Sequence, residues 1–77
     1  MPEVRVTLYA TLRQHLGGEA SAAVEIEPGA TVGEVLGRLG VPVEQARLIF
    51  VDARAAALDR PLQGGEHLAV FPAIAGG

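Results

Sequence analysis

The sequence predicts an α+β fold, in which one main helix packs on one face of a mixed β-sheet. Two observations carry this prediction. Segments of alternating apolar and polar residues, typical of half-buried strands, lie near both ends of the chain. A single amphipathic segment with marked start and stop signals lies between them and predicts the helix. The 77 residues leave room for one domain only.

The first predicted elements are a strand, a short helical turn and a second strand. The first strand places Val4, Val6 and Leu8 on one face and Arg5, Thr7 and Tyr9 on the other. Leu12 and Leu16 are spaced for a helical turn, which Gly17-Gly18 would end. Alternation from residue 22 to residue 27 predicts the second strand, with Val24 and Ile26 facing inward. Two strands joined by so short a connection are expected to be neighbours.

The main helix is predicted to begin at Thr31. Thr31 and Glu34 have the spacing of a capping box, in which each side chain accepts a hydrogen bond from a backbone N–H of the first turn. Gly40 stands where a helix-ending glycine belongs. Gly33 and Gly37 either allow a close approach to the sheet or are tolerated weak points. The apolar stripe that would face the core is Val32, Val35, Leu36 and Leu39.

The rest of the chain predicts further strands and turns. The apolar run 48–51 is interpreted as a central buried strand, followed by a turn at 52–54. Residues 55–58 are a marginal short strand, and Pro61-Leu62 and Gly64-Gly65 are turns. The last strand is expected at 68–71. Together these elements predict a β-grasp-like roll.

Composition and charge exclude several classes of function. The chain has no cysteine, which rules out disulfides, thiol nucleophiles and thiolate metal sites. A net charge of −3 argues against a nucleic-acid partner. No apolar run approaches the ~20 residues that span a bilayer, so neither a membrane segment nor membrane binding is expected, and the predicted location is cytoplasmic. All six basic residues are arginines, so a phosphate-binding Walker motif, which needs lysine, is excluded.

The body of the domain does not resemble a stand-alone enzyme. His15 and His67 lie far apart in the sequence, without the spacing of a metal site, so no metal is expected. Ser21 is the only serine, and no nucleophile motif surrounds it. We therefore predict no catalytic residue.

The C-terminal residues form a different kind of segment. Pro72 has no N–H and is expected to end the last strand, which divides the chain into a domain at 1–71 and a flexible tail at 72–77. Gly76 and Gly77 have no side chain, so they can enter a narrow slot and approach a nucleophile or a phosphate closely. The alternative is a frayed terminus without a role.

Three stretches give the sequence a family resemblance. They are the opening VRVTLYATLR of residues 4–13, the helix start TVGEVL of residues 31–36, and PLQGGEHLAVFPAIAGG of residues 61–77. In these stretches the chain resembles the MoaD/ThiS-like family of ubiquitin-like sulfur carriers, which includes the molybdopterin-synthase small subunits. The resemblance spans nearly the whole chain and implies a β-grasp fold.

This resemblance implies a function for the tail and for one sheet surface. An E1-like partner would use ATP to adenylate Gly77, which would then become a thiocarboxylate, with Gly76, Ala75 and Ile74 threading the partner's slot. The carrier itself would be non-catalytic and would bind no cofactor. Its sulfur would go to the large subunit of molybdopterin synthase or to another accepting enzyme. The implied docking residues are Tyr9, Arg13, Ala55 and Phe71.

The branch within this family stays open at the level of sequence. The opening strand favours the molybdopterin branch, whereas the ending PAIAGG also resembles carriers that feed sulfur into cysteine biosynthesis. Thiamine and tRNA-thiolation pathways are further alternatives, as is a ubiquitin-like modifier that is joined to lysines of other proteins. Asp52-Ala53 replaces the Asn-Gly turn that is usual in the family, and Ala55 is smaller than the usual residue there.

Overall fold

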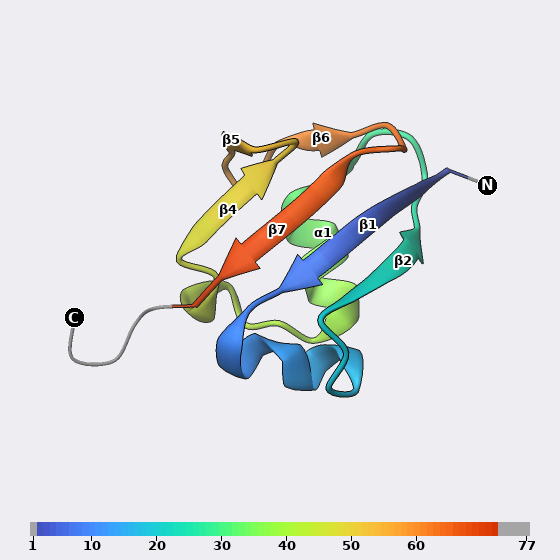
Figure 1. Cartoon of the computed structure of the whole chain (residues 1–77). Helices are drawn as coiled ribbons and strands as arrows, with labels where there is room; N and C mark the ends of the chain where they lie inside the picture. The colour runs from blue at the N-terminus through green and yellow to red at the C-terminus, as the bar shows by residue number, and fades with distance from the viewer. Residues whose placement is uncertain (1, 73–77) are drawn as a thin grey trace.

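The computed structural model describes residues 2–72, which form a five-stranded mixed sheet covered on one face by a helix (Figure 1). The strands of this sheet lie in the order β2-β1-β7-β4-β5, and β3 and β6 form a separate two-stranded pair. This is the β-grasp roll that the sequence predicts. The elements are β1 (Glu3–Leu8), η1 (Ala10–Leu16), β2 (Ser21–Glu25), β3 (Ala30–Thr31), α1 (Val32–Leu39), η2 (Val43–Gln45), β4 (Leu48–Val51), β5 (Arg54–Ala55), β6 (Pro61–Leu62) and β7 (His67–Phe71).

The first and last strands lie side by side in the middle of the sheet. β1 and β7 are parallel, with Arg5 opposite His67 and Leu8 opposite Val70. β2 pairs with the other edge of β1, and β4 with the other edge of β7, both antiparallel. Because side chains alternate along each strand, one face of the sheet is turned toward α1 and the other faces away from it.

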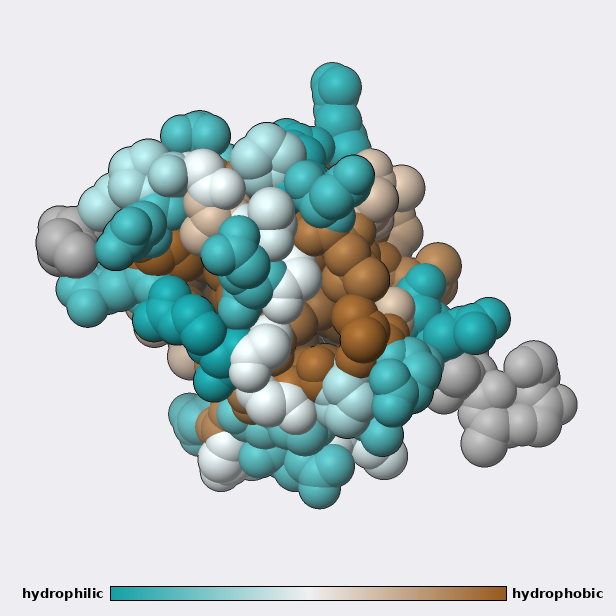
Figure 2. All heavy atoms as spheres, turned by 180° about the vertical axis from the view of Figure 1, so that it is seen from behind, coloured by the Kyte–Doolittle hydropathy of each residue, from teal (hydrophilic) through white to brown (hydrophobic). Residues whose placement is uncertain are grey.

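The core lies between the sheet and α1. Val4, Val6 and Leu8 of β1 are buried, as are Leu68 and Val70 of β7. Their apolar partners come from α1 and from the segments that flank it, and all join in one cluster. Seen from the helix side, apolar surface gathers over part of the molecule (Figure 2). The other members of the buried cluster are Leu12, Ile26, Val32, Val35, Leu36, Val41, Ile49, Val51 and Leu62.

The main helix is confirmed together with its caps. The Glu34 N–H donates to Thr31 Oγ1 at 3.1 Å, and the Thr31 N–H donates to Glu34 Oε1 at 3.0 Å, which completes the capping box. Gly40 ends the helix in the left-handed conformation, with φ of 80°. Pro42 follows as the N-cap of η2, a single turn that sequence patterns did not indicate.

The close approach suggested for Gly33 and Gly37 occurs at Gly33 only, and not to the sheet. The Gly33 N–H donates to the carbonyl oxygen of Leu58 at 2.8 Å, so the chain segment before β6 crosses the start of α1. A Cβ atom added at Gly33 would lie 3.3 Å from this same oxygen. A Cβ at Gly37 would meet nothing within 4 Å. Gly37 is therefore a tolerated weak point of the helix.

Several predicted elements require correction. The turn after β1 is a seven-residue 3-10 helix, and the second strand ends at Glu25 instead of residue 27. β4 lies inside the sheet, between β7 and β5, but it is buried on one face only: Ile49 and Val51 are buried, whereas Leu48 is 55% exposed. The marginal strand at 55–58 is the two-residue β5 at Arg54–Ala55. Pro61-Leu62, interpreted as a turn, pairs with Ala30–Thr31 as β6, where Leu62 is buried in the core and Ala30 packs against it.

Candidate functional site: an aromatic surface on the open face of the sheet

Three aromatic rings meet on the face of the sheet that is turned away from α1. Tyr9 and Phe71 are stacked, with ring centroids 4.1 Å apart and an interplanar angle of 7°. Phe50 meets Phe71 edge to face, at 5.8 Å and 89°. Offset-stacked and edge-to-face pairs are both favourable aromatic geometries. Tyr9 is 38% exposed, so the cluster is open to solvent.

The three rings border a hollow of about 330 Å³. Leu48 lies opposite Phe71 in the register of β4 and β7. The Leu48 side chain is 55% exposed and extends the apolar surface beside the rings. Exposed apolar surface with a polar rim is typical of protein interaction sites. The residues that line the hollow are Tyr9, Phe50, Ala53, His67, Ala69 and Phe71. We call these residues, together with Leu48, the aromatic surface.

Backbone hydrogen bonds fix the end of β7 from both sides. The Tyr9 N–H donates to the Val70 carbonyl oxygen at 3.2 Å, which places Tyr9 beside Phe71. The Arg47 N–H donates to the Phe71 carbonyl oxygen at 3.0 Å. Pro72 follows directly and has no N–H with which to extend the ladder. The last strand therefore ends at Phe71, at the border of the aromatic surface.

The turn between β4 and β5 forms another border of the hollow. Asp52 and Ala53 both have positive φ, at 51° and 69°, which is a strained conformation for alanine. The turn is held to β7 because the Asp52 N–H donates to the His67 carbonyl oxygen at 2.9 Å and the His67 N–H donates to Asp52 Oδ1 at 3.0 Å. The His67 ring in turn lies 2.7 Å from the Thr7 hydroxyl, measured from Nε2 to Oγ1.

The loop that leads into β7 is organised by one carboxylate. The N–H groups of Gln63 and Gly64 donate to Glu66 at 2.8 and 2.7 Å. Partial burial acts to raise the pKa of Glu66, and so does the charge of Asp52. The hydrogen bonds from the N–H groups of Gln63, Gly64 and Glu66 itself outweigh both and hold the pKa below its usual range. The ionised Glu66 thus fixes the start of the strand that carries Phe71.

The structure unites three of the four predicted docking residues. Tyr9 and Phe71 are in contact, and Ala55 lies opposite Phe50 across β4 and β5, on the same face. Arg13 is exposed on η1, outside the set that lines the hollow. A docking role for these four residues stays a prediction. Ile74, Ala75, Gly76 and Gly77 lie outside the described residues.

Sequence reasoning missed Phe50 and His67. The run 48–51 predicts a central buried strand and does not single out Phe50, whereas in the structure its neighbours Ile49 and Val51 are the residues that point inward. His67 was placed just before the last strand, whereas β7 begins with it. Alternation is the signal that could have identified this face. Phe50 lies between the inward-pointing Ile49 and Val51, and Phe71 follows the inward-pointing Val70, so both rings point to the opposite face of the sheet.

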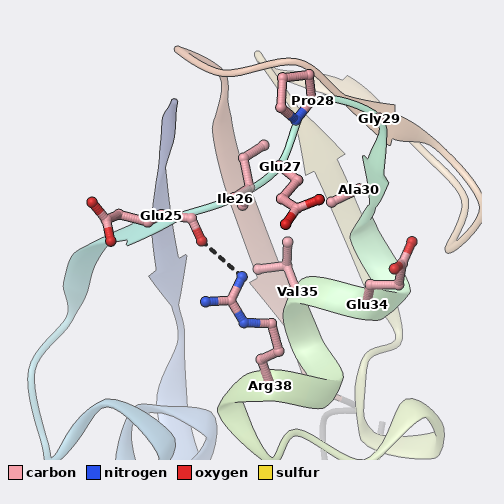
Figure 3. Close-up of a pocket in the computed structure, with 9 residues that line it drawn as sticks. All are labelled: Glu25, Ile26, Glu27, Pro28, Gly29, Ala30, Glu34, Val35 and Arg38. Atoms are coloured by element: carbon pink, nitrogen blue, oxygen red, sulfur yellow. Dashed lines mark hydrogen bonds between the residues drawn. The ribbon is translucent and has the colours of Figure 1, made fainter. Parts of the chain in front are cut away.

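A second hollow, of about 600 Å³, lies between α1 and the connection from β2 to β3 (Figure 3). Glu25, Glu27 and Glu34 line it, so its character is acidic. Arg38 Nη1 donates to the Glu25 carbonyl oxygen at 2.7 Å and joins the helix to the edge strand. Within residues 2–72 no group of three or more His, Cys, Asp or Glu side chains could hold a metal ion. No helix in this range is long and apolar enough to cross a membrane.

Comparison with known protein families assigns the chain to one of them. The profile of the family described as Mut7-C ubiquitin matches residues 1–76. The chain belongs to the Mut7-C ubiquitin family. This ubiquitin-like assignment and the solved structures together confirm the resemblance to MoaD/ThiS-like proteins. A comparison with curated proteins finds no match.

Solved structures similar to this Mut7-C ubiquitin chain include a modifier protein and two protein complexes. Small archaeal modifier protein 1 of H. volcanii is 26% identical, with a TM-score of 0.76 over 96% of this chain and 100% of that chain. A chain of the Amycolatopsis orientalis BexX/CysO complex is 31% identical, with a TM-score of 0.65 over 96% and 99%. The complex of subunits 1 and 2 of the molybdopterin-converting factor from Helicobacter pylori shares the fold, at 16% identity and a TM-score of 0.62 over 97% and 99%.

Proposed function

We propose that this chain is a sulfur carrier, with the Gly77 carboxyl group as the site that is activated and loaded. A carboxylate oxygen of Gly77 attacks the α-phosphate of ATP in a partner enzyme, which releases pyrophosphate and forms an acyl-adenylate. Hydrosulfide from the sulfur donor then attacks the acyl carbon, displaces AMP and leaves a thiocarboxylate. The chain supplies the acyl group, and the catalysis belongs to its partners.

One observation carries this proposal. The last strand ends at Phe71, which is itself part of the exposed aromatic surface, so a partner that receives the residues after Pro72 can contact that surface at the same time. Membership of a ubiquitin-like family and likeness to a subunit of a molybdopterin-converting factor support it. A tethered sulfur is also presented to the accepting enzyme at a high effective concentration.

For the pathway we propose molybdopterin synthesis, with this chain as the small subunit and a large subunit as the sulfur acceptor. The opening strand supports this branch. In that complex the aromatic surface would contact the large subunit while the tail enters its active site. Cysteine, thiamine and tRNA-thiolation pathways would use the same thiocarboxylate with a different acceptor.

The experiment loads the protein and measures its intact mass. The chain is incubated with its cognate adenylating enzyme, ATP and a sulfur donor, and the expected product is heavier by one exchange of oxygen for sulfur. Adding the cognate large subunit and the molybdopterin precursor should return the mass to its starting value. An unchanged mass after incubation with all components would refute the carrier function.

The Gly76→Val variant tests the threading of the tail. Valine adds a branched side chain that a narrow slot would exclude, and residue 76 lies beyond the last strand, so the fold should not depend on it. We expect an unchanged melting temperature and no loading with sulfur. A variant that is loaded at the wild-type rate would contradict a narrow slot.

A ubiquitin-like modifier is the second candidate function, because the similar protein of H. volcanii is described as a modifier. In that case the Gly77 acyl group would be transferred to a lysine amine of another protein, with AMP as the leaving group. Purification of the tagged chain from its native cells under denaturing conditions distinguishes the two functions. Covalent adducts of higher mass support the modifier, and a free chain with a thiocarboxylate supports the carrier.

A further inference from the structure

The five-stranded sheet has one edge that is long enough to pair with another chain. Its edge strands are β2, which has five residues, and β5, which has two (Figure 1). Exposed edges carry unpaired backbone groups, which proteins often protect with lysine, proline or a bulge. The β2 sequence SAAVE has neither lysine nor proline, and its register with β1 is continuous over all five residues. The outer edge of β2 is therefore a regular surface for strand pairing.

The hydrogen bonds between β1 and β2 show which backbone groups of β2 point outward. At one end of this ladder the Leu8 N–H donates to the Ala20 carbonyl oxygen at 3.0 Å. At the other end the Ile26 N–H donates to the Pro2 carbonyl oxygen at 2.9 Å. Because bonded and non-bonded pairs alternate in an antiparallel ladder, the even-numbered residues of β2 bond to β1. The N–H and C=O groups of residues 21, 23 and 25 therefore point away from the sheet.

The contact of Arg38 with Glu25 agrees with this direction. The Glu25 carbonyl oxygen accepts a hydrogen bond from Arg38 Nη1 at 2.7 Å, and Arg38 belongs to α1 and not to β1 (Figure 3). A carbonyl oxygen has two lone pairs, so it can accept a second hydrogen bond from a neighbouring strand. The small side chains of Ser21 and Ala23 leave the other outward groups accessible.

We propose that β2 pairs with β2 of a second copy of this chain, antiparallel and about a two-fold axis at Ala23. An isologous contact of this kind is closed, so it gives a dimer. In this register all five residues of both strands are paired, with Ser21 opposite Glu25 of the second copy. The outward groups of Ala23 bond to those of Ala23 in the second copy, and the two sheets join into one.

The exposed face of the sheet carries complementary charges in this register. Within one chain Glu3 lies opposite Glu25, and like charges at opposed positions are unfavourable. Arg5 Nη1 donates to Ser21 Oγ at 3.3 Å, so its guanidinium group extends over β2 toward the edge. In the dimer this guanidinium meets Glu25 of the second copy, and the symmetry gives the same ion pair twice. A register centred one residue earlier would place Glu25 opposite Glu19 instead.

The face of β2 that is turned toward α1 is complementary in size. Ala22 of one copy lies opposite Val24 of the other, so a small side chain meets a larger one. Both residues are half-buried in the single chain, and Val24 packs against the core. Pairing therefore extends the apolar core across the interface.

This dimer leaves the aromatic surface free. β1 separates β2 from β7, which carries Phe71. The two-fold axis of an antiparallel strand pair is perpendicular to the sheet, so the exposed faces of both copies lie on the same side. A dimer therefore presents two aromatic surfaces side by side. If this surface is the docking site, one dimer can bind two partner subunits.

Sedimentation equilibrium of the full chain tests the pairing. A contact between two short strands is at the small end of interface sizes, so the chain should be mainly monomeric at about 10 µM and mainly dimeric at about 1 mM. Ala23→Pro removes an outward N–H only, which an edge strand tolerates. This variant should keep the far-UV circular dichroism of the wild type and stay monomeric at about 1 mM.

Charge reversal gives a second test that does not depend on proline. Arg5→Glu and Glu25→Arg should each weaken the dimer by about tenfold or more, and the double variant should dimerise nearly as well as the wild type. Matched controls are Arg54→Glu and Glu44→Arg, which make the same changes of charge at exposed positions outside β2. Both controls should leave the dissociation constant near the wild-type value.

Three results would overturn the proposal. They are a wild-type chain that stays monomeric at about 1 mM, a dimer that Ala23→Pro does not weaken, and a double variant that dimerises no better than the single reversals. A dimer that is weakened by Leu48→Gln and not by Ala23→Pro would place the contact at the aromatic surface instead. None of these measurements involves the activation of Gly77, so they can fail or succeed independently of the proposed sulfur loading.

Discussion

Gly33 and Gly37 lie one turn apart on α1, and their surroundings predict opposite results for the same substitution. Gly37→Ala should raise the free energy of unfolding by about 0.5–1 kcal/mol, because alanine is the better helix former and its Cβ meets open space. Gly33→Ala should gain nothing or lose stability, because its Cβ would crowd the Leu58 carbonyl oxygen at 3.3 Å. Urea denaturation of the two variants makes the comparison. Equal gains would show that the Leu58 segment moves freely.

Glu66 predicts a pH dependence of stability. Its pKa in the folded protein lies below the ordinary value of 4.5, so ionised Glu66 stabilises the fold at pH values above 4.5. This contribution is lost as the pH falls through the lowered pKa. The Glu66→Gln substitution should therefore reduce the free energy of unfolding at pH 7 and have a smaller effect at pH 3. A loss of the same size at both pH values would mean that the charge of Glu66 is unimportant.

At the scale of an element, the turn between β4 and β5 combines a strained conformation with a position at the hollow. Ala53→Gly should raise the free energy of unfolding by about 1 kcal/mol, because glycine adopts a φ of 69° without steric cost. Ala57→Gly is the matched control, since Ala57 is exposed and does not share the positive φ. It should lower stability by some tenths of a kcal/mol, because glycine gives the unfolded chain more conformations. Thermal melts of both variants test the prediction.

The elements that the sequence predicts correctly are those whose signals lie within the element itself. α1 could be predicted with its ends because Thr31, Glu34 and Gly40 act within the helix itself, and β1 because its alternation is complete. β3 and β6 could not, because two-residue strands exist only through their pairing with each other. The same reason explains the error at β4. Its four residues are all apolar, and only the tertiary structure shows that α1 covers one face and leaves Leu48 on the other exposed.

At the scale of the whole molecule, the two faces of the sheet predict different effects of the same polar substitution. Leu48→Gln changes the aromatic surface and should raise the KM for loading by the adenylating partner about tenfold, the loss that one interface hot spot produces. Leu58→Gln is the matched control on the helix side, where Leu58 is 36% exposed beside Gly33. It should leave the KM near the wild-type value. Equal effects of both substitutions would place the docking surface elsewhere.

The candidate site was partly accessible from sequence. Tyr9 and Phe71 were named because the family resemblance supplied their role, and the structure shows the contact between their rings. The positions of Phe50 and Ala53 in the site depend on how β4 pairs with β7. Phe50 lies opposite Ala69 of β7, and the turn that contains Ala53 is held in place by the hydrogen bond between Asp52 and His67. A linear sequence does not contain this register. The tail could be described only by its composition.

The parallel pairing of β1 and β7 has a consequence for quality control. Arg5 and His67 are separated by 62 positions in the chain yet lie opposite each other in the central pair of the sheet. Contacts of such long range form only after the entropy of closing the intervening loop has been overcome. The aromatic surface takes one ring each from the end of β1, from β4 and from β7, so it exists only when this pairing is complete. A misfolded or truncated copy can still display Gly-Gly, but it lacks the surface on which a partner would dock. Activation that requires both features would proofread the fold, and sulfur would be loaded only onto intact carriers.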